Sequence, residues 1–526
     1  MRAFLASSIG VACTAALALP LLAPPAVAAP QAVAATPSAP DLPGSTQSLP
    51  LVPLPGLERA GGGTVAQGLP QRDVDPFSLV GVVWDDPDSE LQGAVEVRTR
   101  ATGSDDWSAW QDVETHNFEH APDPGSPERA AGTVRGSTAP LWVGDSDGVE
   151  VRVRPEPAPG AARAAAPPLP GGLRLELVDP GEVPETPQPG TAQPGTAQPV
   201  TLQPGTAQPV TLQPGSTLPG EGENALPGNP VPGNPVAGNP LPGNPVPGNP
   251  LPGIPQPENP QPGEVEGEEL PGTVPDAGLA AWLTAESAAA SAVNAELAPL
   301  GADMITPQTK AETEAEAAPY GVAKPYVGPR PGIVTRKGWG ADESLREKQF
   351  VYTKSVKAAF VHHSATGNRF TCAQSASVLR SIYRYHVESS GWRDIGYNFA
   401  VDKCGNIYEG RAGGVAKAVL GAHTRGFNSN SMGIAVLGTY SSTTPPAAAV
   451  QAIAKLTAWK LGLFGMNPKS TTFLTSAGGN KFKLGTQAKL NVISGHRDGF
   501  ATDCPGARLY GQLGAVRTLS AKLQGR

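Results

Sequence analysis

Cysteine is scarce in this chain of 526 residues, which contains four. One of them, Cys13, lies in the apolar N-terminal stretch, so a chain that has lost this stretch retains Cys372, Cys404 and Cys504. An odd number of cysteines in an oxidising compartment excludes complete pairing and leaves one thiol for another task, such as binding a metal ion. We predict that Cys372 pairs with Cys404. The alternative for Cys504 is a buried free thiol.

Long apolar runs are also missing, except at the N-terminus. No later segment approaches the roughly twenty apolar residues of a membrane-spanning helix, which excludes such a helix from the mature chain. Arg2, the apolar residues 12–23 and the small residues 26–28 are typical of a signal peptide over residues 1–28. A lipoprotein anchored at Cys13 is the alternative, but the apolar run before it is short. We expect a secreted, cell wall associated protein.

Charge is unevenly distributed, and recognised nucleic-acid-binding modules are lacking. Residues 331–526 hold 25 Lys and Arg against 9 Asp and Glu, a balance of +16, whereas the preceding residues hold 14 against 38, a balance of −24. A cationic exported domain favours an anionic partner, such as the acidic polymers of a bacterial wall. Nucleic acid would satisfy the sign of the charge, but export and the missing modules argue against it.

Glycine and proline are abundant, with 63 and 59 residues. Over residues 181–275 they form repeats: six Gln-Pro-x-x-x pentads begin between Gln188 and Gln213, and Pro-Gly-Asn-Pro units follow over residues 226–250. Such spacing of proline favours extended backbone without an apolar face, which predicts a long disordered linker. An alanine-rich segment and further linker follow over residues 276–330, with a helix expected near 279–300.

The first folded module is predicted over residues 72–180, after a flexible lead over residues 29–71. Period-two alternation of apolar and polar residues predicts strands at 77–84, 94–100, 149–154 and 173–177. This pattern favours an antiparallel, all-β, sandwich-like module of unknown ligand. Residues 121–136 and 158–170 are expected to be disordered insertions.

Three tryptophans of this module, Trp107, Trp110 and Trp142, offer two interpretations. They could form an aromatic platform that binds sugar rings. The alternative is that they pack in the core or across neighbouring strands, which is the more common use of tryptophan in a β module.

The basic C-terminal part, residues 331–526, combines strand and helix signals. Strands are expected at 356–361, 397–401, 407–408, 432–437 and 491–494, and helices from Ser375, at 447–464 and at 509–523. On the first helix, Val378, Leu379, Ile382 and His386 fall on one face, so His386 is predicted to be a core histidine.

Three residues of this part carry ligand chemistry. His362 ends an apolar strand in Val361-His362-His363-Ser364, and His496 precedes Cys504 by eight residues. Two imidazoles and one thiolate leave a tetrahedral zinc ion one ligand short, which is the open coordination of a catalytic site. We expect water in the fourth position. His363 points to the opposite face of its strand and is predicted to pack rather than to bind metal.

Six motifs in one order carry a family resemblance over about residues 331–526. They are Trp339-Gly340-Ala341, Val361-His362-His363-Ser364, residues 391–399 (GWRDIGYNF), Tyr408-Glu409-Gly410-Arg411, Gly421-Ala422-His423-Thr424 and Gly495-His496-Arg497-Asp498. This part of the chain resembles the peptidoglycan recognition protein and bacteriophage-type zinc amidase family.

The resemblance implies an α/β amidase domain, with a central, mostly β sheet flanked by helices. It also implies an N-acetylmuramoyl-L-alanine amidase, which hydrolyses the amide between N-acetylmuramic acid and L-alanine of the peptidoglycan stem peptide. His362, His496 and Cys504 match the zinc ligands of the family, and Tyr397 matches the tyrosine that assists catalysis. Thr502 stands where phage-type members have a lysine, so a hydroxyl must serve there instead of a cation.

The chemistry of the residues agrees with such a catalytic site. Zn²⁺ makes hydroxide available near neutral pH and polarises the scissile carbonyl. The phenol of Tyr397 would donate to the developing oxyanion, the alternative being a core tyrosine. No glutamate is placed as the general base of an HExxH protease, so we expect hydroxide assisted by Tyr397 or Thr502 to be the nucleophile.

A substrate groove is expected beside the metal site. The residues predicted to line it are His423, Arg411, Asn428 and Asn430. We expect a monomer that acts on peptidoglycan and associates with anionic wall polymers.

Two other classes of protein remain open at this point. The C-terminal domain could be a non-catalytic module that only binds peptidoglycan, although the presence of all three ligands argues against this. Alternatively, the whole chain could be a structural or adhesive wall protein in which the long spacer is the functional element.

Overall fold

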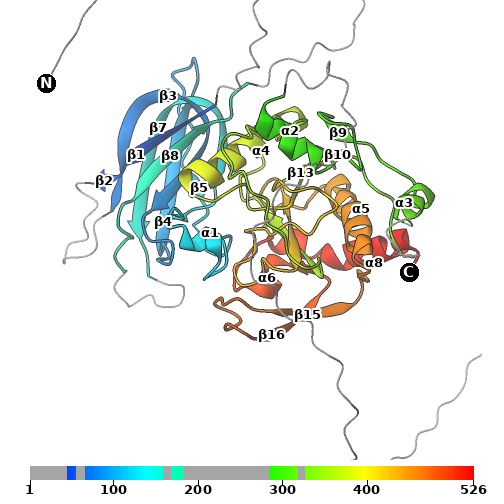
Figure 1. Cartoon of the computed structure of the whole chain (residues 1–526). Coiled ribbons are helices and arrows are strands. Elements are labelled where there is room, and N and C mark those ends of the chain that lie inside the picture. Colours follow the sequence, from blue (N-terminus) through cyan, green and yellow to red (C-terminus); the bar gives the residue numbers. More distant parts are fainter. Residues whose placement is uncertain (1–43, 55–65, 116, 158–166, 183–282, 318–325) are drawn as a thin grey trace, which may run out of the picture. The chain divides into compact units, whose positions relative to one another are not determined.

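A computed structural model describes residues 44–54, 66–115, 117–157, 167–182, 283–317 and 326–526 (Figure 1). The segments on either side of the repeat region, up to Pro184 and from Pro275 onward, form one compact unit. Both predicted folded modules belong to this unit. The predicted signal peptide and the repeats of the linker lie outside the described residues.

The N-terminal module is an antiparallel β sheet, which confirms the predicted all-β class. Its strands are β1 (Ser45–Pro50), β2 (Val52–Pro53), β3 (Gln67–Trp84), β4 (Gly93–Ala101), β5 (Gln111–Val113), β6 (Gly136–Ser137), β7 (Leu141–Pro155) and β8 (Arg174–Asp179). They follow the order β1-β8-β3-β7-β4-β5, while β2 and β6 pair with β3. Register shifts between β3 and β7 mark irregularities, at which strands typically bend.

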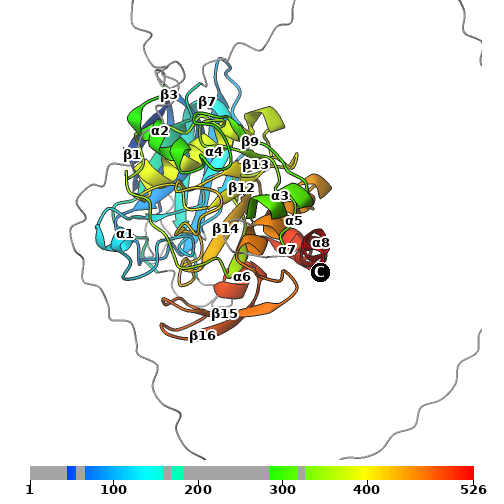
Figure 2. The same cartoon turned by 45° about the vertical axis from the view of Figure 1, so that its right-hand side comes forward.

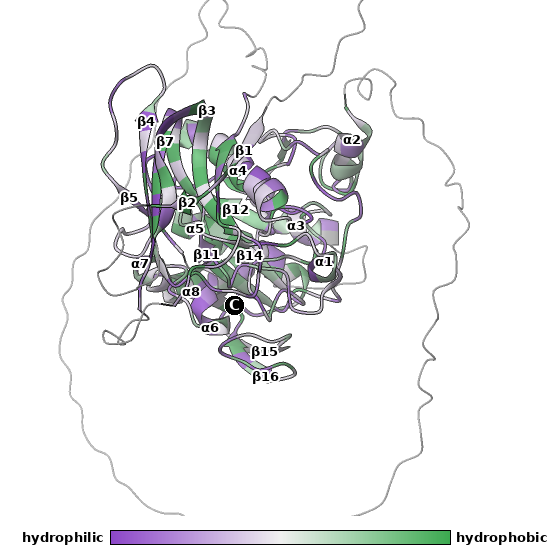
Figure 3. Ribbon diagram, turned by 90° about the vertical axis from the view of Figure 1, so that its left-hand side faces the viewer, coloured by the Kyte–Doolittle hydropathy of each residue, from purple (hydrophilic) through white to green (hydrophobic). Residues whose placement is uncertain are grey.

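Successive side chains of a strand point to opposite faces of the sheet, so the fully buried second half of β3 has two apolar faces. Apolar bands mark this part of the sheet in Figure 3. Val80 and Val82 pack into the core of the N-terminal module. Leu79 and Val83 pack instead against apolar side chains of the C-terminal domain. Because both sets are fully buried, the strand joins two cores.

The sheet begins earlier than expected, because β1 lies inside the predicted flexible lead over residues 29–71. This edge strand pairs with β8. Among its side chains, Leu49 alone packs against the core of the N-terminal module, so β1 has almost none of the apolar periodicity by which a strand is predicted.

The expectation of a disordered insertion at residues 121–136 was wrong. The segment contains the short helix α1 (Pro127–Ala130), whose first turn is capped by Ser126 Oγ accepting from Arg129 N at 3.2 Å. The buried side chain of this helix, Glu128, pairs with Arg411 of the C-terminal domain. Because this contact is distant in the sequence, no local pattern predicted the ordered segment. Of the second insertion, residues 158–166 lie outside the described part of the chain.

The tryptophans of this module pack rather than form a platform. Trp142 is 3% exposed and belongs to the apolar cluster that spans both domains. The guanidinium of Arg152 lies 4.0 Å from the Trp110 ring centroid, and that of Arg98 lies 5.5 Å from the Trp107 ring centroid. These cation–π contacts place arginine side chains over the rings on which a sugar would have to stack.

The C-terminal domain has a mixed seven-stranded sheet in the order β17-β11-β14-β12-β13-β10-β9. Its strands are β9 (Met304–Ile305), β10 (Ile333–Val334), β11 (Ala358–His363), β12 (Phe399–Val401), β13 (Ile407–Glu409), β14 (Ser431–Val436) and β17 (Ile493–Gly495). Strand β11, next to the edge strand β17, runs parallel to both of its neighbours, β14 and β17. A separate hairpin of β15 (Thr471–Thr475) and β16 (Gln487–Asn491) accompanies it.

Helices cover both faces of this sheet, as expected for the α/β class. They are α2 (Ala285–Ala292), α3 (Lys310–Ala317), α4 (Ser375–Arg384), α5 (Ala447–Leu463), α6 (His496–Gly499), α7 (Ala507–Tyr510) and α8 (Leu513–Gln524). Helices α5 and α8 lie side by side (Figure 1 and Figure 2). Alternate residues of β14 sort the two layers: Ile434 and Val436 pack with α5 and α8, whereas Ala435 packs with α4. Among the described helices, none combines the length and apolar character needed to cross a membrane.

The alanine-rich segment contributes to this domain rather than only linking to it. Its helix α2 is followed by Asn294, whose side chain donates to Glu409 Oε1 at 2.9 Å. Strand β9 pairs with β10 and extends the sheet. The domain therefore includes residues before the predicted boundary at 331.

The two domains share an apolar contact surface. Leu79 and Val178 of the N-terminal sheet lie in one cluster with Leu379 and Ile382 of α4. Gly81 permits this approach, because a Cβ atom there would lie 2.4 Å from Tyr385 Oη. The contact fixes where the loops of the N-terminal sheet meet the C-terminal domain.

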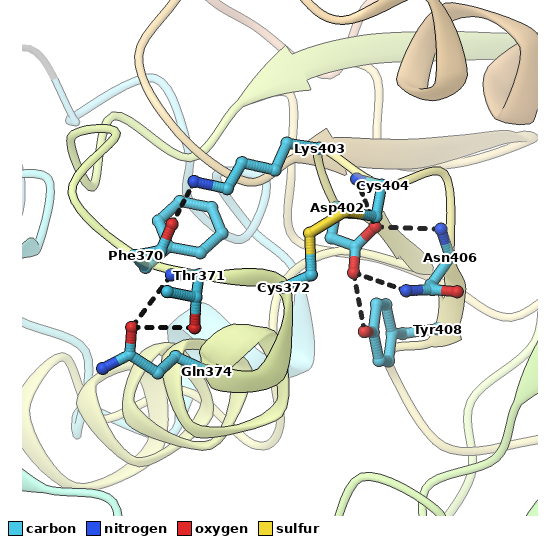
Figure 4. The surroundings of a disulfide bond; sticks show 9 residues. All are labelled: Phe370, Thr371, Cys372, Gln374, Asp402, Lys403, Cys404, Asn406 and Tyr408. Carbon is cyan, nitrogen blue, oxygen red and sulfur yellow. Dashed lines mark hydrogen bonds between the residues drawn. A yellow bond between two sulfur atoms is a disulfide. The ribbon is translucent and has the colours of Figure 1, made fainter.

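The predicted Cys372–Cys404 disulfide is present (Figure 4). It joins the start of the helical segment before α4 to the turn between β12 and β13, with the two Cα atoms 6.2 Å apart. Asp402 orders this turn by accepting from Cys404 N and Asn406 N at 2.9 Å each.

Loss of this disulfide is expected to lower stability without affecting the metal centre. A Cys372→Ala/Cys404→Ala variant should lose about 3 kcal/mol of unfolding free energy, because the crosslink restricts the unfolded chain. Denaturant titration would measure the loss. Wild-type protein reduced while unfolded and then refolded serves as the control, and it should show the same decrease.

Candidate metal centre

His362 reaches the centre from the sheet. It lies near the end of β11, where it pairs with Ala435 of β14. All six side chains of β11 are buried, so the apolar run that predicted the strand also fixes the position of the histidine. His362 itself is fully buried.

His496 enters beside His362 because the neighbouring strands are in register. Val361 pairs with Gly495 at the end of β17, and the residue after each of them is a histidine. Helix α6 begins at His496, and Asp498 Oδ2 accepts from Gly495 N at 2.9 Å. The two imidazole rings lie 4.5 Å apart between centroids.

Cys504 returns to the same place on the loop after α6. Its carbonyl accepts from Arg497 N at 3.0 Å, and its amide donates to Thr502 Oγ1 at 3.1 Å. The Sγ atom lies 3.7 Å from His362 Nδ1. The structure thus brings together the three ligands predicted from the sequence.

A fourth residue, His120, completes the cluster. It lies on the loop between β5 and β6 of the N-terminal module, and its Nε2 atom is 3.2 Å from His362 Nδ1 and 3.6 Å from Cys504 Sγ. The ligand atoms of His120, His362, His496 and Cys504 all lie within 4.8 Å of one another. Sequence reasoning missed His120, because the histidine lies 242 positions before His362 in a segment without periodic pattern.

The cluster fits a metal ion by two observations. Tetrahedral zinc–ligand bonds of ordinary length place two nitrogens about 3.3 Å apart and a nitrogen and a sulfur about 3.6 Å apart, close to the distances between these atoms. In addition, His496 is fully buried, and neither of its ring nitrogens makes a well-aligned hydrogen bond among the described residues. The backbone of Glu119 is close enough to raise the pKa of the ring slightly, against the larger effect of burial.

The electrostatics of the cluster agree with cation binding. Burial lowers the pKa of His120, His362 and His496 well below the ordinary value, so each ring keeps a free lone pair at neutral pH. Burial raises the pKa of the Cys504 thiol well above its ordinary value. A thiolate in this position therefore needs a neighbouring cation, which a metal ion would supply.

Tyr397 lies against the cluster, just before β12. Its ring centroid is 5.6 Å from that of His362 and 5.9 Å from that of His120. Burial raises the pKa of the phenol well above its ordinary value, which keeps the hydroxyl protonated and able to donate.

Thr502 is bonded on both sides. Besides accepting from Cys504 N, its hydroxyl donates to Glu119 Oε1 of the N-terminal module at 2.5 Å. The threonine hydroxyl thus lies beside Cys504 of the cluster, and its proton is engaged by Glu119.

His423 lies behind His362, with the two ring centroids 5.4 Å apart. It is fully buried, its Nδ1 atom is 3.0 Å from Thr424 Oγ1, and its Nε2 atom is 3.3 Å from Ser431 Oγ. Thr424 Oγ1 in turn lies 3.4 Å from His362 Nε2. This arrangement orients the ring of His362.

The remaining residues predicted to line the groove, Arg411, Asn428 and Asn430, do not lie together. Arg411 is buried and donates to both carboxylate oxygens of Glu128, at 2.9 and 3.1 Å. Asn428 donates to the Ala121 carbonyl at 2.9 Å. Asn430 instead precedes β14, five residues before Ala435, which at about 3.3 Å per residue places it far along the sheet from the cluster.

The two other histidines of the domain pack as predicted. His363 Nδ1 lies 3.3 Å from Tyr440 N, which donates to it. His386 accepts from Gly396 N at 3.2 Å, and its ring stacks on Trp392 at 4.3 Å between centroids.

Two families match this chain. Residues 352–507 match the family described as N-acetylmuramoyl-L-alanine amidase. Residues 30–171 match the family described as Rv3811 N-terminal galactose-binding domain-like. The two matches fall on the two folded modules.

Individual relatives match the C-terminal domain. Peptidoglycan-recognition protein SC2 of Drosophila simulans is 31% identical over 181 residues, which are 34% of this chain and 84% of that protein. The N-acetylmuramoyl-L-alanine amidase of Homo sapiens is 31% identical over 187 residues, or 35% of this chain and 28% of that protein. The solved structure of Drosophila PGRP-LB is 25% identical and covers 35% of this chain and 92% of that chain, with a TM-score of 0.28.

Through its C-terminal domain, the chain belongs to the family of peptidoglycan recognition proteins and N-acetylmuramoyl-L-alanine amidases. The resemblance stated from the six sequence motifs is thereby confirmed.

Proposed function

We propose that this protein is a secreted, zinc-dependent N-acetylmuramoyl-L-alanine amidase, which hydrolyses the amide between N-acetylmuramic acid and L-alanine of the peptidoglycan stem peptide. The observation that carries the proposal is the convergence of His362, His496 and Cys504 at one end of the sheet, next to Tyr397. The match of residues 352–507 to an amidase family supports the reaction class.

In this proposal, His362, His496 and Cys504 hold the ion, with His423 and Thr424 orienting the first of them. When bound, zinc supplies a nucleophile at neutral pH and polarises the scissile carbonyl. The cysteine contributes a thiolate that partly neutralises the charge of the cation.

Tyr397 serves as the oxyanion donor in this proposal. Its phenol keeps its proton because burial raises its pKa, so it can donate to the oxygen on which negative charge develops. Thr502 is the second hydroxyl near the reaction. Once Glu119 no longer engages it, its Oγ1 atom can take up the proton lost by the attacking water while its own proton passes to the leaving nitrogen, so that no alkoxide remains.

Arg411 and Asn428 are proposed to contact the substrate. Both present buried polar groups to the surface that the loop between β5 and β6 covers. A guanidinium and an amide at this position suit carboxylate and carbonyl groups of a peptide. The basic balance of the domain fits an anionic wall as its surroundings.

A second candidate function is binding of peptidoglycan without cleavage. The observation that favours it is the closed set of His120, His362, His496 and Cys504, which resembles a structural rather than an open metal site. Membership of a family that includes recognition proteins is compatible with either function.

Product analysis distinguishes the two functions. The full chain loaded with zinc and incubated at high concentration with purified peptidoglycan should release peptides with a free N-terminal L-alanine, identified by mass spectrometry. Chelated protein serves as the control and should release none. Sedimentation of the protein with peptidoglycan and no such peptides would support the binding function.

A further inference from the structure

The loop between β5 and β6 extends from the N-terminal sheet into the C-terminal domain; its described residues are 114–115 and 117–135, and we name it the β5–β6 loop. Of the four clustered residues, His120 alone lies on this loop. The other three come from strand ends and from the loop after α6 of the C-terminal domain. His120 is 5% exposed.

We propose that His120 is the fourth protein ligand of the metal site and that the β5–β6 loop fills the substrate groove, so that the chain folds as a latent enzyme. The proposal rests on the proposed function, because it takes His362, His496 and Cys504 as the catalytic set. A zinc ion with four protein ligands has a closed coordination sphere, whereas catalysis requires one open position. The loop must therefore withdraw before hydrolysis.

The contacts of His120 support a ligand role. Its Nε2 atom lies at ligand-to-ligand distance from two of the other ligand atoms, 3.2 Å from His362 Nδ1 and 3.6 Å from Cys504 Sγ. Its ring centroid lies 4.3 Å from that of His496. Its Nδ1 atom is buried without a hydrogen-bond partner among the described residues, so no hydrogen bond from that atom accounts for the orientation of this ring.

Around His120, the loop engages the residues that the reaction would use. Glu119 accepts the hydroxyl proton of Thr502 at 2.5 Å. Asp123 Oδ1 accepts from Asn428 Nδ2 and from Gly426 N, each at 2.7 Å. Carboxylate and carbonyl oxygens of the loop therefore accept hydrogen bonds from the donors of the groove, as the oxygens of a peptide substrate would.

The strongest of these anchors is the ion pair between Glu128 and Arg411. Both side chains are nearly fully buried, and both carboxylate oxygens accept from the guanidinium. Removing one partner of a buried pair leaves an uncompensated charge, so the loop does not leave Arg411 spontaneously. A ligand that brings its own carboxylate can replace Glu128, which suggests how an anionic substrate displaces the loop.

The loop can withdraw without separating the domains. Its contacts are mainly polar, apart from a small apolar cluster of Ala121 and Val134 with Trp392 and Ala422 and an edge-on contact of Phe118 with Phe500, whose ring centroids lie 6.2 Å apart. The large apolar contact between the two domains is made by β3, β7, β8 and α4 instead. Opening of the site therefore requires movement of the β5–β6 loop alone.

The test compares the wild-type full chain with His120→Ala and with Pro124→Ala, an exposed position of the same loop. Each protein is loaded with Co²⁺ and titrated with azide, which changes the visible spectrum when it binds an open coordination position. Retention of Zn²⁺ against a chromophoric chelator is measured in parallel. Wild type and Pro124→Ala should not respond to azide, whereas His120→Ala should respond and should hold zinc at least about tenfold more weakly.

The outcomes separate this proposal from the proposed function. Equal azide response and equal zinc retention in all three proteins would overturn the ligand role of His120, whether or not any of them cleaves peptidoglycan. Complete loss of zinc from His120→Ala would make the cluster a structural site and would overturn the proposal of a latent enzyme. If His120→Ala binds azide but does not cleave peptidoglycan, the closed coordination of the wild-type site is supported and the amidase function is refuted. Faster peptide release from His120→Ala, by about tenfold or more, would support both.

A second variant protects the test against misfolding of the first. Glu128→Gln keeps all four clustered side chains and weakens the contacts of Glu128 with Arg411 and Arg393. It should show partial azide access and an intermediate rate of peptide release. Asp112→Asn is the matched control, because it removes the same charge from an exposed position on β5. An unchanged Glu128→Gln protein, with His120→Ala also unchanged or unfolded, would contradict the role of the loop.

Discussion

Replacing Cys504 by serine is expected to remove zinc from the protein and to reduce amide hydrolysis by at least about 1000-fold. The rate loss follows from the several kcal/mol that a bound ion contributes to charge stabilisation in the transition state. The loss of affinity follows from the site itself. Without the thiolate, three neutral imidazoles remain in a buried pocket and do not offset the charge of the cation.

Metal analysis after gel filtration and the rate of peptide release would measure the two effects of Cys504→Ser. The disulfide-free variant, Cys372→Ala/Cys404→Ala, is the matched control, because it also loses sulfur atoms but none near the cluster. It should keep one zinc ion per chain. Full zinc content in Cys504→Ser would show that Cys504 is not a ligand.

Replacing Tyr397 by phenylalanine is expected to lower kcat by about 100-fold, since the loss of one oxyanion donor typically has this effect. Zinc content should not change, because Tyr397 is not one of the clustered ligands. Tyr408→Phe is the matched control. Its hydroxyl donates to Asp402 Oδ2 at 2.9 Å, away from the metal centre, so the same chemical change there should leave kcat unaltered.

The Tyr397→Phe comparison should be made in the wild-type chain and in His120→Ala. If the β5–β6 loop only blocks access, the ratio of rates with and without the phenol is the same in both backgrounds. A Tyr397→Phe substitution that leaves the rate unchanged in both backgrounds would remove the phenol from the reaction and leave Tyr397 with a packing role.

Much of the metal centre could be predicted because its residues follow regular elements. The apolar run before His362 predicts a strand, and a strand end holds its next side chain at a defined place. The same argument applies to His496 after β17. Cys504 was singled out by the odd number of cysteines rather than by any element.

The remaining part of the centre depends on contacts between domains. His120 and Glu128 lie on a loop without apolar periodicity, and their partners are hundreds of residues away. A buried carboxylate with a distant arginine leaves no local signal, so the segment resembled a disordered insertion. The hydroxyl of Thr502 was expected to act in catalysis, yet its bond to Glu119 was equally invisible in the sequence.

The groove candidates illustrate a further limit of sequence reasoning. Arg411 and Asn428, two of the residues predicted to line the groove, both face the β5–β6 loop. Asn430 was predicted to line the same groove. A turn at residues 429–430 separates the two asparagines, and Asn430 has a positive φ of 58° just before β14, so neighbours in sequence need not share one site.

The close fit of Gly81 against Tyr385 bears on how this protein can evolve. A long repeat region suggests a chain assembled from exchangeable parts, in which either part could be replaced by recombination. The shared apolar cluster argues otherwise, because a foreign partner would leave Leu79 and Ile382 facing water. The two domains are therefore expected to be exchanged only as a pair.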